Sequence, residues 1–405
     1  MTSRIHWAWF VLTASFSTVL IHYSIRLGYG ILMPEMILSL KITKAQAGTI
    51  ASSFFLAYSI FAPIMGFLVD RANARILLVV FPVVFALGTF SMGTPQTLFQ
   101  ACLSFFVVGV GASVMWTPVV TLVQRWFGSR RRGMALGILS LSYAVGYGIM
   151  GIVLPLLVAH SGWRACWFLL GAVAFLLAPL NGIFIRNRPQ DFHLKPWGEE
   201  RETDPQTSAE QPPGKVSFRV LLRWPTLWLT GISYFFISFT AYVVNLFIVT
   251  YGNLELKYPF AQAARLATAI AFSGILGALL LPLLSDFIGR KRCLVFINAG
   301  MPVSILLIIW AGSTWPALIA AVCIYGVFYA AVWPMYAAAA ADFFPREATG
   351  SVLGFWTIFY GCSLALAPVG GGYLADVTGT FNYSFLAGAI CGCLALLFLL
   401  PLKKK

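Results

Sequence analysis

Long apolar runs separated by short polar breaks fill the chain from one end to the other. A helix that crosses a bilayer needs about 20 mostly apolar residues, and twelve runs reach that length. They lie near residues 7–34, 46–69, 76–94, 98–124, 133–159, 164–185, 225–251, 261–285, 292–312, 316–341, 350–375 and 382–402. One longer polar stretch, residues 186–224, separates the first six runs from the last six. The pattern predicts an all-α membrane protein with twelve transmembrane helices in two six-helix bundles, residues 1–185 and 225–405, joined by a linker.

The second half of the chain repeats residues of the first half at a nearly constant spacing. Asp70 and Asp286 lie 216 residues apart, each in a charged break between two apolar runs. Further along, identical residues recur 217 positions later, namely Trp116 and Trp333, Phe127 and Phe344, Gly133 and Gly350, Gly137 and Gly354, Tyr143 and Tyr360, Gly162 and Gly379, Phe168 and Phe385, and Gly171 and Gly388. A fixed spacing over most of both halves indicates duplication. We therefore expect two pseudo-symmetric bundles with a pathway between them.

The composition supports a location in the bilayer. Only 10% of the residues are charged and 60% are hydrophobic, whereas a soluble domain carries about 25% charged residues. If the termini, the linker and the even-numbered connections face the cytoplasm, that side holds most of the 27 Lys and Arg residues. The positive-inside rule therefore predicts cytoplasmic termini in a plasma membrane, such as the bacterial inner membrane. The net charge of +14 follows from this bias, and we expect no nucleic-acid binding.

A charged motif interrupts the apolar pattern at matching places in the two halves. The first copy comprises Gly66, Asp70, Arg71 and Arg75, and the second comprises Asp286, Gly289 and Arg290, with Pro282 in the position of the glycine. The motif resembles the cytoplasmic loop signature of the major facilitator superfamily of secondary transporters, and the resemblance covers almost the whole chain. It implies the major facilitator fold and a gating role, because a carboxylate at a helix end can pair with arginines and with a neighbouring helix N-terminus. The alternative is that these charges only anchor the loops.

A narrower resemblance points to two branches of that family. The stretches that carry it are Trp116-Thr117-Pro118, Arg125-Trp126-Phe127, residues 131–137, Gly162-Trp163-Arg164 and residues 188–198. They are similar to the monocarboxylate-porter and oxalate–formate-antiporter branches. The chain departs from each branch at one position. Its eighth helix lacks the arginine that monocarboxylate porters usually carry there, and its eleventh lacks the lysine of oxalate-type porters.

Arg26 is the only basic residue well inside a predicted helix, and no acidic residue lies near the middle of one. A charge in the membrane interior is energetically costly, so its presence is informative. An arginine in a cavity would bind a carboxylate or sulfonate through its planar fork of donors. The alternative is a structural arginine that reaches the outer interface or bonds backbone carbonyls. A single central cation favours a monoanion over a dicarboxylate.

Polar aromatic residues and one amide complete the predicted substrate site. Repeat symmetry, helical spacing and proximity to Arg26 select Tyr29, Trp116, Tyr143, Tyr329, Trp333 and Tyr360. Asn245 is added as the only amide of the seventh predicted helix. Such side chains suit a small organic anion in a wettable cavity, although each also fits helix packing or a lipid-facing belt. His22, one turn before Arg26, is a candidate for ion coupling or a simple hydrogen-bonding residue. The sequence holds no phosphate-binding loop, metal-ligand cluster or nucleophile with a base, so we expect no enzyme activity, metal or cofactor.

Together these features predict a secondary active transporter for a small, monocarboxylate-like organic anion that works by alternating access. Its partners would be the substrate, a co-transported or exchanged ion such as a proton, and the lipid bilayer, with the protein acting as a monomer. Three alternatives stay open. They are a multidrug exporter in which Arg26 is structural, a membrane sensor that binds a ligand without flux, and an inorganic-anion carrier, for which two facing arginines would be expected.

Overall fold

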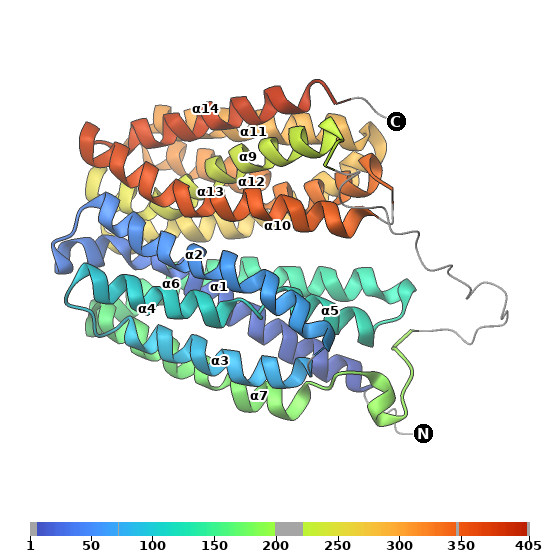
Figure 1. Ribbon diagram of the computed structural model, residues 1–405. Helices are drawn as coiled ribbons and strands as arrows, with labels where there is room; N and C mark the ends of the chain where they lie inside the picture. The colour runs from blue at the N-terminus through green and yellow to red at the C-terminus, as the bar shows by residue number, and fades with distance from the viewer. Residues whose placement is uncertain (1–5, 72, 199–221, 346–347, 403–405) are drawn as a thin grey trace. The chain divides into compact units, whose positions relative to one another are not determined.

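The structure is a computed structural model, which describes all residues except 1–5, 72, 199–221, 346–347 and 403–405 (Figure 1). The described residues are almost entirely helical, and the one isolated β-bridge among them pairs Phe127 with Trp197. The chain divides into two compact units. The first comprises Met1–Ile42 and Thr49–Glu202, and the second comprises Thr43–Gly48 and Thr203–Lys405. The division after residue 202 lies within the predicted linker.

Seven α-helices and a short 3₁₀ helix lie in the N-terminal half of the described chain. They are α1 (Trp7–Leu40), α2 (Lys44–Arg71), α3 (Ala74–Ser91), α4 (Leu98–Ala112), α5 (Thr117–Trp126), α6 (Ser129–Phe175), α7 (Leu177–Phe184) and η1 (Pro189–Phe192). The apolar stretch Arg130–Phe184 has 55 residues and would be about 80 Å long as one helix, against a bilayer core of about 30 Å. A break at Gly162, where φ is 76° and ψ is 169°, divides it into two crossings.

The C-terminal half has six α-helices and a short π-helix among its described residues. They are α9 (Pro225–Thr250), η2 (Tyr251–Glu255), α10 (Phe260–Ile288), α11 (Arg290–Ala311), α12 (Trp315–Phe343), α13 (Thr349–Thr378) and α14 (Phe381–Leu399). Eleven apolar helical stretches of the described chain are long enough to cross a membrane. Because the stretch broken at Gly162 crosses twice, they give twelve crossings. The predicted fold class is confirmed.

The packing of both units suits a protein surrounded by lipid. Large apolar side chains stand on the surface, for example Phe287 with 88% and Trp310 with 78% of its area exposed. Inside, small residues let membrane helices approach closely. At Gly277 on α10, an added Cβ would lie 1.8 Å from the carbonyl oxygen of Val327 on α12. A larger residue would therefore force these two helices apart.

The first part of the predicted linker is folded onto the end of the first unit. The indole Nε1 of Trp126 donates to the carbonyl oxygen of Arg186 at 2.8 Å. The backbone N–H of Trp197 donates to the carbonyl of Trp126 at 2.9 Å, and the Gly128 N–H donates to the carbonyl of Trp197 at 3.0 Å. These bonds hold residues 186–198 against the first bundle, although most of their side chains are exposed.

Candidate functional site

Arg26 lies on α1 inside the first unit, where aromatic rings flank its charge. Only 7% of the residue is exposed. Its guanidinium carbon Cζ lies 4.9 Å from the ring centroid of Phe55 on α2 and 5.5 Å from that of Tyr23 on its own helix. A cation over an aromatic ring gains about 0.5–2 kcal/mol, more when water is excluded. These contacts help Arg26 to remain charged in an apolar setting.

Tyr23 joins Arg26 to two of the predicted site residues. Its ring meets the ring of Tyr143 on α6 edge-on, with 4.9 Å between centroids, and that of Trp116 at 6.2 Å. Trp116 occupies the break between α4 and α5, and Pro118, which has no N–H to donate, lies in the first turn of α5. The structure thus gathers Arg26, Trp116 and Tyr143 around a residue that the sequence prediction missed. Tyr23 precedes Arg26 by three residues, so helical spacing would have selected it.

His22 and Tyr29 occupy different surroundings. His22 is fully buried, and neither of its ring nitrogens has a hydrogen-bond partner among the residues that the structure describes. Tyr29 is also fully buried, and its ring packs against those of Phe105 and Trp167, with 4.8 and 6.5 Å between centroids. Helix packing accounts for the position of Tyr29, whereas His22 places polar atoms in an apolar setting.

The second unit contains an aromatic group of the same composition. Tyr234 on α9 lies against Trp333 on α12 and Tyr360 on α13, with 6.0 and 5.6 Å between ring centroids. Each unit thus gathers a tyrosine from its first transmembrane helix, a tryptophan from its fourth and a tyrosine from its fifth. We call Tyr23, Trp116 and Tyr143 the first aromatic triad, and Tyr234, Trp333 and Tyr360 the second. The sequence prediction missed both Tyr23 and Tyr234, and the repeat does not link them because they lie 211 rather than 217 residues apart.

The two remaining predicted residues, Asn245 and Tyr329, meet through Tyr325 on α12. The Asn245 Nδ2 donates to the Tyr325 hydroxyl and to the Ala241 carbonyl, both at 3.1 Å. The Tyr325 hydroxyl donates to the same carbonyl at 2.6 Å, and the Tyr325 ring stacks on that of Tyr329 with 5.8 Å between centroids. These buried hydrogen bonds fix α9 against α12 and hold Asn245 beside the ring pair.

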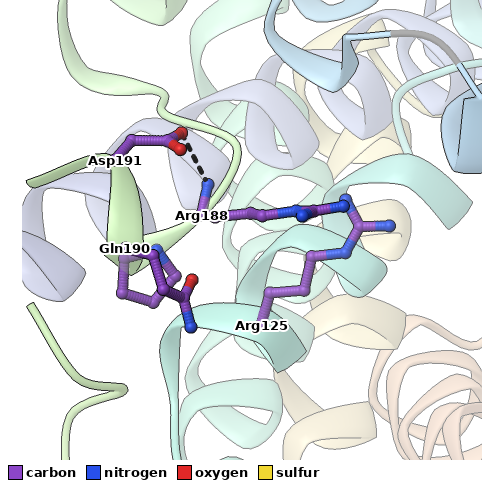
Figure 2. A pocket seen from close by; sticks show the side chains of 5 residues that line it. Arg125, Arg188, Gln190 and Asp191 are labelled. Atoms are coloured by element: carbon purple, nitrogen blue, oxygen red, sulfur yellow. Dashed lines mark hydrogen bonds between the residues drawn. The ribbon is translucent and has the colours of Figure 1, made fainter.

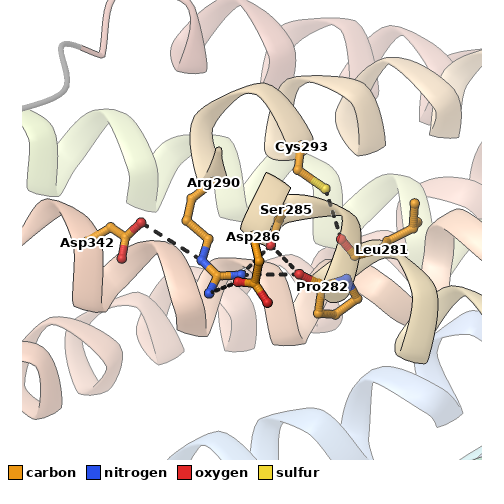
Figure 3. Close-up of polar contacts among 7 residues, drawn as sticks. All are labelled: Leu281, Pro282, Ser285, Asp286, Arg290, Cys293 and Asp342. Atoms are coloured by element: carbon orange, nitrogen blue, oxygen red, sulfur yellow. Dashed lines mark hydrogen bonds and ion pairs between the residues drawn. The ribbon is translucent and has the colours of Figure 1, made fainter. Parts of the chain in front are cut away.

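The second copy of the charged motif forms an ion-pair cluster (Figure 3). Arg290 Nη2 lies 2.6 Å from Asp286, and its Nε lies 3.9 Å from Asp342 near the end of α12. Arg290 also donates to the hydroxyl of Ser285. Gly289 has φ 91° and ψ 145°, a conformation that a residue with a Cβ adopts only with strain. All five residues belong to the second unit, so the cluster ties together the ends of α10, α11 and α12.

In the first copy, Arg75 donates from Nε and Nη2 to the carbonyl of Gly182 on α7, at 3.1 and 2.5 Å. An added Cβ at Gly66 would meet no atom within 4 Å, so packing does not require a glycine there. The side chains of Asp70 and Arg71 lie outside the described part of the structure. A gating latch between the two bundles therefore stays a prediction.

A cavity of about 460 Å³ opens at the end of the first unit, lined by Arg125, Arg188, Pro189, Gln190 and Asp191 (Figure 2). The Asp191 carboxylate accepts a hydrogen bond from the backbone N–H of Arg188 at 3.2 Å, which holds the two ends of this short turn together. Arg125 lies nine residues after Trp116, or roughly 13 Å along the helix. The cavity is therefore separate from the first aromatic triad.

Comparison with known proteins identifies the family. The model described as Major Facilitator Superfamily matches residues 14–286 and 230–405, which together cover nearly the whole chain. The chain belongs to the Major Facilitator Superfamily. Membership confirms the predicted family and the classification as a multi-pass secondary transporter rather than an enzyme.

Three relatives show how the chain compares with individual members. It is 25% identical to a probable hexose phosphate transport protein of Chlamydia muridarum, over 98% of this chain and 91% of the relative. It is 26% identical to the membrane sensor protein UhpC of Escherichia coli K12, over 98% of this chain and 92% of the relative. The crystal structure of a point mutant of the nucleoside transporter NupG superimposes with a TM-score of 0.77 at 14% identity, over 97% of this chain and 100% of that chain. This last similarity shows the fold alone.

Proposed function

We propose that this superfamily member transports a small organic anion, with Arg26 as its main counter-charge. The observation that carries the proposal is a positive charge, 7% exposed, held among aromatic rings in the interior of the first unit. A bound anion would place a full negative charge beside Arg26, which the surrounding aromatic rings do not provide.

The first aromatic triad supplies the rest of the binding surface beside Arg26. Its rings provide flat apolar faces, while the hydroxyls of Tyr23 and Tyr143 and the indole N–H of Trp116 provide polar tips. Such a lining suits a ligand with one charged end and a compact organic body. We assign the second aromatic triad the same task in its own unit, because the two triads have the same composition and come from corresponding helices.

The charge balance favours a monoanion such as a carboxylate or sulfonate. A phosphate monoester carries about −1.5 to −2 charges at pH 7, whereas Arg26 supplies one positive charge. The similarity to a probable hexose phosphate transport protein supports an organic anion in general. The single cation supports the monocarboxylate-like class that the sequence predicts.

The proposal is tested by binding and then by flux. Purified protein is first screened by thermal shift against a hexuronate, a short alkyl sulfonate, a hexose phosphate and a hydrophobic cation, and any stabilising compound is then assayed for uptake into proteoliposomes. We expect the carboxylate or sulfonate to stabilise the protein and to enter protein-containing vesicles faster than empty ones. Stabilisation by the hydrophobic cation alone would contradict the proposal and favour a multidrug exporter.

A ligand sensor is the second candidate function, since the chain is similar to the membrane sensor protein UhpC over nearly its full length. A sensor and a transporter of the same fold share a binding site and differ in whether the bound ligand is released on the opposite side. An anion that binds saturably while its flux equals that of empty vesicles would identify a sensor.

A further inference from the structure

We propose that His22 is a proton-binding site coupled to the anion at Arg26, so that one proton accompanies each transported anion. The inference deepens the proposed function by naming the coupling ion, and it rests on that function.

His22 lies in the interior of the first unit as an isolated polar group. Its exposed area is 0%, and both Nδ1 and Nε2 lack a hydrogen-bond partner among the described residues. Rings form its surroundings, with centroids at 4.9 Å for Tyr23, 5.9 Å for Phe85 and 6.4 Å for Phe54. Leaving a buried polar group unpaired is unfavourable. A buried, titratable side chain without a structural hydrogen bond is therefore a candidate for binding an ion.

The side chains around His22 show which charged group its protonation would affect most, namely Arg26. The elements packed against it contribute Phe54 from α2 and Phe85 from α3, which do not titrate. On α1 itself, the titratable or charged neighbours are Tyr23 and Arg26, the latter one helical turn away. The next titratable group is Tyr143 of α6, whose ring contacts the ring of Tyr23. A proton on His22 therefore acts most directly on the charge of Arg26.

Two positive charges one turn apart on a helix repel each other. A protonated His22 beside Arg26 therefore becomes favourable when an anion occupies Arg26 and offsets its charge. The proton on His22 and the anion on Arg26 are opposite unit charges about 6–12 Å apart. At an effective dielectric constant of about 20 they should strengthen each other's binding by roughly tenfold to a hundredfold. Because such coupling is reciprocal, the anion also binds more tightly when His22 is protonated.

Further polar side chains lie along α1 toward its N-terminal end. Thr18 and Ser15 precede His22 by four and seven residues, so the three share one face of the helix. All three are fully buried. Thr18 donates to Asn181 of α7 at 3.0 Å, while the Ser15 hydroxyl has no partner in the described structure. Buried polar groups therefore continue from His22 along the same face of α1 toward that end of the helix.

The first experiment compares anion binding at about pH 5.5 and about pH 8 by calorimetry. For the wild-type protein we expect the affinity to be higher at the lower pH, by between tenfold and a hundredfold. His22→Gln should lose this pH dependence. His160→Gln, which changes an exposed histidine on α6, should keep it. An affinity that varies equally with pH in wild type and His22→Gln would overturn the assignment.

The second experiment measures transport. In proteoliposomes with an imposed pH gradient, the wild-type protein should accumulate the anion. In His22→Gln, the ratio of gradient-driven accumulation to anion exchange should be at least tenfold lower. A pH-indicator dye should report about one proton taken up per anion bound by the wild-type protein in weak buffer, a test that needs no variant. Anion transport without proton uptake would overturn the inference alone, whereas no anion binding at all would overturn the proposed function.

Discussion

Replacing Arg26 with alanine removes the charge, all of its donors and its contacts with Tyr23 and Phe55. When one partner of a buried charge pair is removed, the uncompensated partner typically costs about 3–5 kcal/mol. At about 1.4 kcal/mol per factor of ten, this corresponds to roughly two to three decades in affinity. We expect Arg26→Ala to weaken anion binding by that amount and to abolish measurable transport.

The same substitution should change stability much less than binding. It removes two cation–π contacts, worth about 0.5–2 kcal/mol each, but it also removes a desolvated charge, which is unfavourable to bury. Arg26→Lys keeps a point charge and loses the second donor of the fork. A hydrogen bond to a charged group contributes about 1.5–3 kcal/mol, so the lysine variant should bind roughly one to two decades more weakly than the wild type.

Calorimetric titration and thermal melting of the purified variants measure the two effects separately. Arg164→Ala is a matched control, because Arg164 donates to the carbonyl of Pro95 at 2.8 Å and to Ser39 at 3.3 Å and serves a structural role. The control should lower the melting temperature and leave anion affinity within a few-fold. If Arg26→Ala instead binds the anion as the wild type does and melts at a lower temperature, Arg26 is structural and the proposed function is wrong.

Three further predictions concern the ends of the first unit. Burial lowers the pKa of His6 below its usual 6.5, and the neutral ring accepts the hydrogen bond that caps α1. The cap therefore stabilises the fold above about pH 6.5, and this stabilisation is lost as the pH falls and the ring is protonated. The protection of amides at the start of α1, measured against their intrinsic exchange rate at each pH, should fall below about pH 6, and His6→Asn should remove this fall. Trp197→Ala should release the docked segment, measured as faster tryptic cleavage after Arg186, which is followed by Asn187. In intact cells, Gln96→Cys should react with an impermeant thiol reagent and Gln190→Cys should not, and the reverse result would invert the predicted topology.

The helices could be predicted from the sequence because their cause is local. A run of about 20 apolar residues has few alternatives to a membrane helix, and the predicted boundaries lie within a few residues of those observed for most helices. The docked segment 186–198 could not be predicted in the same way. Its composition is polar, and its order depends on backbone hydrogen bonds with Trp126 and Gly128, which are distant in sequence.

The candidate site was predictable where one strong physical rule applied. Arg26 is conspicuous because a charge within an apolar helix is rare, and the repeat selected the tryptophan and the second tyrosine of each triad. Tyr325 was missed because nothing in its local sequence marks a hydroxyl that will meet Asn245 on another helix. Such partners depend on how two helices are rotated against each other, and the chain encodes that rotation only through packing.

The two aromatic triads bear on how this duplicated chain has changed over time. The tryptophan and one tyrosine of each triad keep the spacing of the repeat, whereas Tyr23 and Tyr234 do not. After duplication, either the first helix of one half shifted its register or one tyrosine arose separately at a new position. In both cases the two halves now share a spatial arrangement without a positional correspondence for this tyrosine. An alignment of the two halves column by column would therefore miss the correspondence between Tyr23 and Tyr234. A comparison of side-chain positions in the two units would find it.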